Sequence, residues 1–171
     1  MKNLLLFVLL LSILMATHGA AEPSRGEWHD GVFISEAFGL NFTPPDGWYS
    51  EPDDRALMVA QGPAHDEWFR EAVWLSVMES NMTIEEYFAG VLAGNVAEVA
   101  GDEPLRVLQI QDHTTRIGRY DWNSYSYWGI DGGIVHVFVR AVDGFRQEIS
   151  IFCGRETESL EEILAMFSPL E

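Results

Sequence analysis

The chain has 171 residues, of which 27 are acidic and 10 are basic, so its formal net charge is −17. Phosphate binding depends on clustered Lys and Arg. The arginines here are scattered among acidic residues, and we therefore exclude nucleic acid as a partner. Cys153 is the only cysteine, which excludes an intramolecular disulfide, so the apolar core must hold the fold.

Residues 1–21 have the layout of a secretory signal peptide. Lys2 precedes an apolar run over residues 4–15, and small residues at 19–21 come before Glu22. The apolar run is shorter than the roughly 20 residues that a membrane-spanning helix needs. No cysteine follows the cleavage site, which excludes a lipid anchor. We therefore expect an exported protein, periplasmic or secreted, with no membrane anchor after cleavage and no lysine for Schiff-base chemistry.

After the signal peptide we expect a flexible N-terminal leader at residues 22–31 and a single domain at 32–171. A domain of this size buries about two thirds of its unfolded surface. Alternating apolar residues at 38–42 predict a strand, and Pro44-Pro45-Asp46-Gly47 predicts the turn that follows it. Two further strands are predicted at 56–61 and 73–78.

An amphipathic helix is predicted over residues 84–99, because its apolar residues recur with a period of 3.6. Thr83 and Glu86 form a capping box at its start, and Gly101 ends it. One broad apolar face of this helix must lie against a sheet.

Five consecutive strands are predicted after the helix, at 105–111, 114–120, 121–130, 134–142 and 145–153. Asp143-Gly144 is a strong two-residue hairpin signal, because both positions favour positive φ. Residues 131–133 read as a three-residue turn. Counting back from these turns places His136 opposite Ile151 on one side and opposite Trp128 on the other.

Both faces of the predicted sheet are apolar, so both must be covered. One face collects Trp122, Trp128, Ile130, Ile134, Phe138, Ile149, Ile151 and Cys153, and the other Tyr125, Tyr127, Val135, Val137, Val139 and Phe152. The helix at 84–99 can cover one of them. A terminal helix, started by Ser159 with Glu162 and carrying apolar residues to Phe167, can cover the other. The fold class is therefore α+β, a mainly antiparallel sheet packed by helices.

The segment 38–48, which ends in Pro45-Asp46-Gly47-Trp48, and the tail 163–169 resemble the PsbP-like family, whose fold is the Mog-type α/β/α sandwich. The resemblance covers nearly the whole chain after the signal peptide. It implies an α/β/α sandwich and a binding module rather than an enzyme. No catalytic motif comes with the resemblance, so no site residue is carried over from it, and we expect no cofactor. Bacterial relatives are often lipoproteins, and this chain departs from them in lacking the anchor cysteine.

Four groups of residues invite a catalytic or metal-binding interpretation. Cys153 and His136 fall on one sheet face as diagonal neighbours about 7 Å apart, but apolar surroundings make a thiol inert, so we expect both to be packing residues. His65, Asp66 and Glu67 could bind a metal, as could His29-Asp30 and Asp112-His113. None has a recognised ligand spacing, so no metal site is predicted.

The loop between the strands at 56–61 and 73–78 is the predicted contact surface, because Trp68 and Phe69 follow His65, Asp66 and Glu67 in a polar segment. Aromatic side chains favour interfaces. We therefore expect an exported, non-enzymatic binding or accessory module with a protein partner. A small metal-dependent or Cys-His hydrolase is one alternative. A small-ligand carrier is another, and it requires a pocket between sheet and helix. The sequence does not define an oligomeric state.

Overall fold

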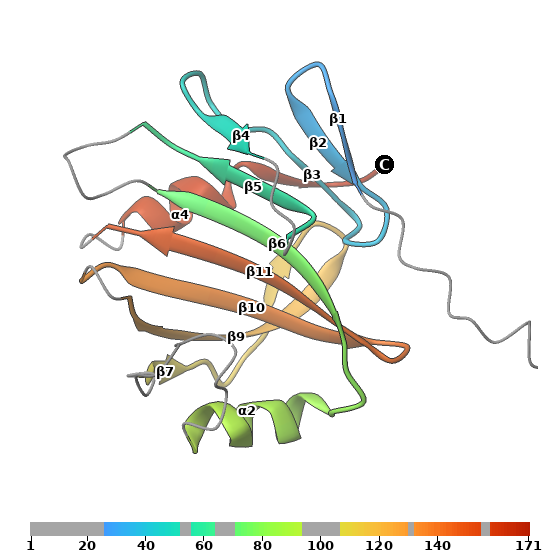
Figure 1. Ribbon diagram of the computed structural model, residues 1–171, viewed down its shortest axis with the longest axis vertical. Helices are drawn as coiled ribbons and strands as arrows, with labels where there is room; N and C mark the ends of the chain where they lie inside the picture. The colour runs from blue at the N-terminus through green and yellow to red at the C-terminus, as the bar shows by residue number, and fades with distance from the viewer. Residues whose placement is uncertain (1–25, 52–55, 64–70, 94–106, 130–131, 155–157) are drawn as a thin grey trace, which may run out of the picture.

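The computed structural model describes residues 26–51, 56–63, 71–93, 107–129, 132–154 and 158–171. In these ranges the chain forms antiparallel sheets and two helices (Figure 1). The strands are β1 (Glu27–His29), β2 (Val32–Ser35), β3 (Leu40–Phe42), β4 (Tyr49–Glu51), β5 (Met58–Gln61), β6 (Ala72–Glu79), β7 (Val107–Ile110), β8 (Thr115–Ile117), β9 (Tyr120–Trp128), β10 (Ile134–Val142), β11 (Phe145–Cys153) and β12 (Phe167–Pro169). The helices are α2 (Ile84–Leu92) and α4 (Glu158–Leu164).

The strands fall into a large and a small sheet. The large sheet has the order β4-β5-β6-β11-β10-β9-β7, with β8 paired to β9 beside this path. The small sheet has the order β1-β2-β3-β12. Every strand pair in both sheets is antiparallel, which confirms the mainly antiparallel sheet expected from the sequence.

The central hairpin of the large sheet has the predicted bounds and register. Val142 pairs with Phe145 and His136 pairs with Ile151. Asp143 and Gly144 both have positive φ, at 43° and 85°, which is the conformation that a two-residue hairpin turn of this kind requires.

The register between β9 and β10 differs from the prediction by two residues. Trp128 pairs with Ile134, and His136 pairs with Ser126 rather than with Trp128. β9 ends at Trp128 rather than at Ile130, whereas β10 begins at Ile134 as predicted. The Gly129 N–H donates to the Gly133 carbonyl, 2.8 Å away, and this bond closes a longer connection than the predicted three-residue turn. A shift of two residues keeps each side chain on its predicted face.

A different layer covers each face of the large sheet. On one face, α2 packs through Tyr87 and Val91 against Tyr125, Val137 and Val139. The opposite core joins the large sheet to both α4 and the small sheet, with these buried members: Phe33, Phe38, Leu40, Phe42, Met58, Ala60, Val73, Leu75, Ile117, Trp122, Phe138, Ile149, Ile151, Cys153 and Ile163. The predicted α/β/α sandwich is therefore only partly correct, because a small sheet shares one outer layer with α4.

The start of α2 matches the sequence prediction. The Glu86 N–H donates to the Thr83 hydroxyl at 3.2 Å, and the Thr83 N–H donates to the Glu86 carboxylate at 2.9 Å. These two bonds are the predicted capping box. The predicted end of the helix at Gly101 lies outside the described residues.

Both ends of the domain differ from the prediction. The expected leader reached residue 31, but β1 begins at Glu27 and pairs with β2. At the other end, α4 begins at Glu158, one residue before Ser159, and it ends at Leu164. Phe167 was expected in that helix, yet it begins β12, which pairs with β3. The tail is therefore a strand of the small sheet.

Candidate functional site

The five residues of the predicted contact loop, His65, Asp66, Glu67, Trp68 and Phe69, lie outside the described residues. The contact-surface prediction for this loop therefore stays a prediction.

The other two candidate metal clusters are exposed local pairs. His29 Nε2 lies 2.8 Å from Glu27 Oε1, and the hydrogen bond to Glu27 raises the pKa of His29. His113 Nδ1 lies 3.0 Å from Asp112 Oδ1, and this bond lowers the pKa of Asp112. In the described part of the chain, no three His, Cys, Asp or Glu side chains gather into a group that could hold a metal ion.

Cys153 has the environment of a packing residue. Its side chain is 1% exposed in the core beneath α4 and the small sheet. Burial is the main cause that raises the pKa of its thiol to about 12, and the charge of Glu71 adds to it. Because the thiolate is the nucleophilic form, Cys153 is inert at neutral pH. The Cys-His hydrolase alternative would need this thiol as its nucleophile, and burial disfavours the thiolate form.

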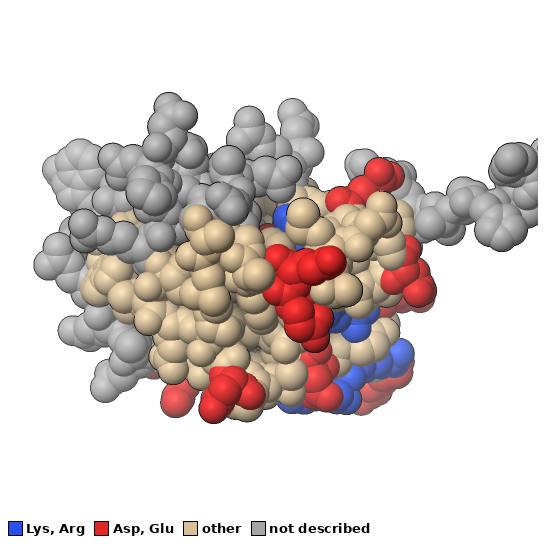
Figure 2. Space-filling view, turned by 90° about the horizontal axis from the view of Figure 1, so that it is seen from below, with Lys and Arg blue, Asp and Glu red and all other residues tan. Residues whose placement is uncertain are grey.

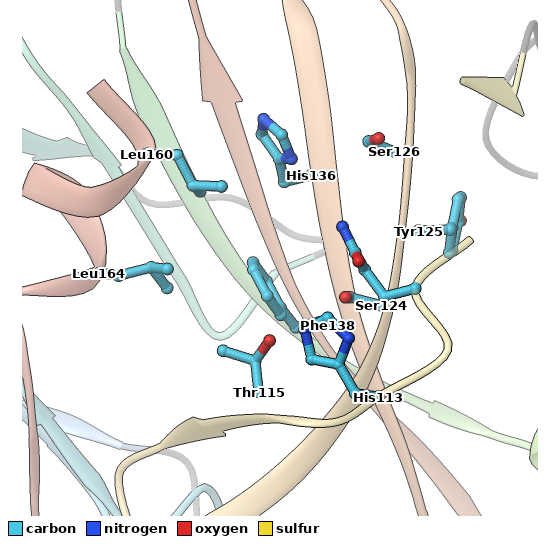
Figure 3. A pocket seen from close by; sticks show the side chains of 10 residues that line it. His113, Thr115, Ser124, Tyr125, Ser126, His136, Phe138, Leu160 and Leu164 are labelled. Carbon is cyan, nitrogen blue, oxygen red and sulfur yellow. The ribbon is translucent and has the colours of Figure 1, made fainter. Parts of the chain in front are cut away.

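His136 lines a cavity of about 100 Å³ between α4, the inner face of β9 and β10, and the connection from β7 to β8 (Figure 3). Leu160 and Leu164 lie on one side of it, and Ser124 and Ser126 on the other, with His136 between them in the view of Figure 3. The lining residues are Gln111, His113, Thr115, Ser124, Tyr125, Ser126, His136, Phe138, Leu160 and Leu164.

The imidazole of His136 is the unusual group of this cavity. Its Nε2 is fully buried and has no hydrogen-bond partner. An unsatisfied buried polar atom costs about 1–3 kcal/mol. With less than 1 Å² of accessible surface, Nε2 itself does not border the open space of the cavity. Burial also lowers the pKa of His136, which keeps the ring neutral at physiological pH.

Two walls of different chemistry face each other across the cavity. Leu160 and Leu164 present carbon from α4, and Phe138 adds an aromatic ring from the sheet. The opposite wall carries hydroxyl groups, those of Ser124, Ser126 and Thr115 among them. Among the described residues, no Asp, Glu, Lys or Arg belongs to the lining, although the chain as a whole is strongly acidic.

A second buried polar group lies on the opposite sheet face, under α2. Glu148 Oε1 lies 2.7 Å from Arg146 Nε, and their side chains are only 7% and 9% exposed. The Tyr87 hydroxyl donates to the same oxygen at 3.0 Å and lies 3.0 Å from the Tyr125 hydroxyl. Burial raises the pKa of both tyrosines far above the physiological range. Hydrogen bonds link the two tyrosine hydroxyls to the Glu148 carboxylate, which is also in an ion pair with Arg146, so we interpret this network as structural.

Charge is unevenly spread over the described surface. In the view from below, uncharged residues cover the middle of the described surface, whereas acidic groups and arginines gather toward its right-hand side and further acidic groups lie at its lower edge (Figure 2). The exposed large apolar side chains of the described residues are Trp28, Tyr49, Met82, Leu92, Leu108 and Trp128. Isolated exposed apolar residues are normal on soluble proteins. No helix in the described ranges is long and apolar enough to span a membrane.

The sequence reasoning missed the cavity because it misplaced the neighbour of His136. The predicted register put the ring opposite Trp128, in apolar surroundings, whereas Ser126 is its actual partner on β9. Ser124 and Ser126 are polar residues of the predicted strand. The turn after that strand was predicted too short, so the predicted register did not place Ser126 opposite His136.

The comparisons with solved structures give the fold. The chain is similar to cyanobacterial PsbP (CyanoP) from Synechocystis sp. PCC 6803, with a TM-score of 0.52 and 12% identity over 90% of this chain and 97% of that one. It therefore has a PsbP-like fold, as the sequence resemblance implied.

Two further structures are more distant. LpqN of Mycobacterium tuberculosis, described as involved in cell envelope biogenesis, has a TM-score of 0.44 and 17% identity over 75% of this chain and 82% of that one. A structure from Bacteroides thetaiotaomicron VPI-5482 has a TM-score of 0.43 and 12% identity over 88% of this chain and 50% of that one. The sequence matches no protein-family model and no curated protein.

Proposed function

We propose that this chain is an exported, non-enzymatic binding module that takes up a group of its partner, a protein, in the cavity between α4 and the large sheet. The observation that carries the proposal is the cavity itself, which has the side chains of Leu160 and Leu164 on one side and the hydroxyl-bearing Ser124 and Ser126 on the other. A partner group with both an apolar and a hydrogen-bonding side can contact both kinds of wall.

Binding suits these residues better than catalysis. A serine nucleophile needs a hydrogen bond to its histidine base, and Nε2 of His136 has no partner although Ser126 lies opposite it on β9. Cys153 is buried with a raised pKa. The resemblance to the PsbP-like family, which implies binding modules, supports the same choice.

A small-ligand carrier is the second candidate, because it requires a pocket between sheet and helix and the cavity lies between Phe138 and Leu160. Its volume is well below the roughly 300–1,000 Å³ of pockets that enclose a drug-sized ligand or cofactor. Native mass spectrometry of protein purified from its own compartment distinguishes the two candidates. A carrier retains a small molecule of constant mass, whereas a module for a protein partner does not.

Site-specific photocrosslinking in living cells tests the binding proposal. A benzoylphenylalanine at position 115, on the cavity wall, should capture one partner protein, whereas the same residue at position 143, on the exposed β10–β11 turn, should not. Combining position 115 with His136→Phe should abolish the capture. Equal capture from both positions, or capture that His136→Phe leaves unchanged, contradicts the proposal. The same photoreactive residue at position 68 tests separately whether the loop with Trp68 is a contact surface.

A further inference from the structure

Two tripeptides of the chain have the form of an N-glycosylation acceptor, in which Ser or Thr lies two positions after an asparagine and the residue between them is not Pro. They are Asn41-Phe42-Thr43 and Asn81-Met82-Thr83. The acceptor must lie in an exposed segment, because the transferase has to bind it and the attached sugar is bulky. The surroundings of the two asparagines therefore decide which of them can be modified.

Asn41 lies in the middle of the small sheet. It is opposite Ile34 of β2 on one side of β3 and opposite Ser168 of β12 on the other. The side-chain oxygen of Asn41 is fully buried. A transferase that bound this tripeptide would have to break the strand pairing on both sides of β3. Asn41 is therefore excluded as an acceptor in the folded protein.

Asn81 has the opposite environment. It lies in the irregular segment that joins the end of β6 to the start of α2. Asn81, Met82 and Thr83 are all exposed, and the backbone of Thr83 is extended, with φ of −70° and ψ of 164°. Glu79 is exposed as well, so a transferase that also recognises an acidic residue ahead of the tripeptide can contact one here. Asn81 is the accessible acceptor of the two.

The position of Asn81 is compatible with the proposed binding cavity. The segment leads into α2, which covers one face of the large sheet, whereas α4 and the cavity lie on the opposite face. The apolar side chain of Met82, next to Asn81, is 57% exposed. An oligosaccharide on Asn81 would shield Met82 from solvent and leave the cavity open.

We propose that Asn81 is an N-glycosylation site of the exported protein, and this inference rests on the export that the proposed function includes. The donor is an oligosaccharide linked to a lipid diphosphate, and an oligosaccharyltransferase catalyses the transfer. The side-chain nitrogen of Asn81 forms a bond to the anomeric carbon of the first sugar while the bond from that carbon to the diphosphate breaks. The lipid diphosphate leaves with the electron pair, and one amide proton passes to a base of the transferase.

Peptide mapping by mass spectrometry tests the site in protein purified from its own compartment. The peptide that contains Asn81 should carry an oligosaccharide, and the peptide that contains Asn41 should not. The same map shows whether residues 1–21 have been removed. Unmodified Asn81 in protein that lacks residues 1–21 overturns the glycosylation proposal and leaves the export intact, as does an oligosaccharide on Asn41 alone. Protein that retains residues 1–21 with Asn81 unmodified overturns both.

Substitutions of Thr83, produced in the same host, supply matched controls. The Thr83 hydroxyl also caps α2 by accepting a hydrogen bond from the Glu86 N–H. Thr83→Ser keeps the cap and the acceptor sequence, so the oligosaccharide should remain. Thr83→Asp keeps a good N-cap but removes the acceptor sequence, so the oligosaccharide should be lost completely without loss of the helix. An oligosaccharide retained on Thr83→Asp overturns the proposal, because the tripeptide would then not direct the modification.

Discussion

Replacing Tyr87 by Phe removes one hydroxyl from the buried network under α2. That hydroxyl is in a side chain that is 2% exposed, and it lies 3.0 Å from both Glu148 Oε1 and the Tyr125 hydroxyl. Tyr87 has one proton to donate, which the carboxylate accepts, so Tyr125 donates to Tyr87. A hydrogen bond to a charged group contributes about 1.5–3 kcal/mol and a neutral one about 1 kcal/mol. We therefore expect the free energy of unfolding to fall by about 3 kcal/mol.

Urea unfolding followed by tryptophan fluorescence measures this loss. With an m-value of about 2 kcal/mol/M, the midpoint should fall by about 1.5 M. Tyr49→Phe is the matched control, since it removes a hydroxyl that donates to Gln61 Oε1 at 2.9 Å on an exposed strand, where water can replace the lost bond. Its effect should stay within about 0.5 kcal/mol. If the two variants lose the same stability, the buried network contributes nothing that an exposed hydrogen bond does not, and the reasoning fails.

Three further predictions concern other positions. Because burial raises the pKa of Cys153 to about 12, the folded protein should resist alkylation by iodoacetamide at pH 8 and should react once urea unfolds it. Rapid reaction without urea would show that the thiol is accessible in the folded protein. Gly118→Ala should lower the free energy of unfolding by more than about 2 kcal/mol, because φ is +60° and a Cβ would lie 2.7 Å from the Gly39 carbonyl oxygen. Gly144→Ala, where φ is +85° and no atom lies near the added Cβ, should lower it by about 1 kcal/mol. Similar urea midpoints for the two variants would exclude a role for the clash. Since burial lowers the pKa of His136 in the folded state, unfolded chains bind its proton more readily, and the free energy of unfolding should decrease as pH falls below about 6.5. His136→Phe should show a smaller decrease in chemical denaturation, and an identical pH profile would contradict the assignment.

The parts of the fold that local sequence signals define were predictable to the residue. The hairpin of β10 and β11 has alternating apolar side chains and an Asp143-Gly144 turn, and together these fix both strand bounds and register. The cap of α2 was predictable for the same reason, because Thr83 and Glu86 are three residues apart and act on each other.

Short strands were harder to predict, since three residues show no periodicity. The segment from Glu27 to His29 was read as part of a leader, yet Asp30 and Gly31 have φ values of 48° and 82° and form a second turn of the Asp-Gly kind. That dipeptide was available in the sequence as a hairpin signal. Phe167 was assigned to a helix because its apolar spacing fits one, but pairing with Phe42 of β3 determines its conformation.

The cavity could be predicted only in part. His136 and its face followed from the β10–β11 register, but Ser126 replaced Trp128 as its neighbour because the connection around Gly129 and Gly133 is longer than a three-residue turn. Leu160 comes from a helix far along the chain, and no local pattern predicts that it closes the opposite wall.

The edges of both sheets bear on how this protein behaves in concentrated solution. The small sheet ends in β1 and β12, and the large sheet ends in β4 on one side; each of these strands has three residues. The other side ends in β7, whose pairing is irregular between Val107 and Gln109. Short or bulged edges are poor templates for pairing with another chain. The long apolar strands β10 and β11 have neighbours on both sides. The described fold therefore keeps its most aggregation-prone segments away from intermolecular strand pairing.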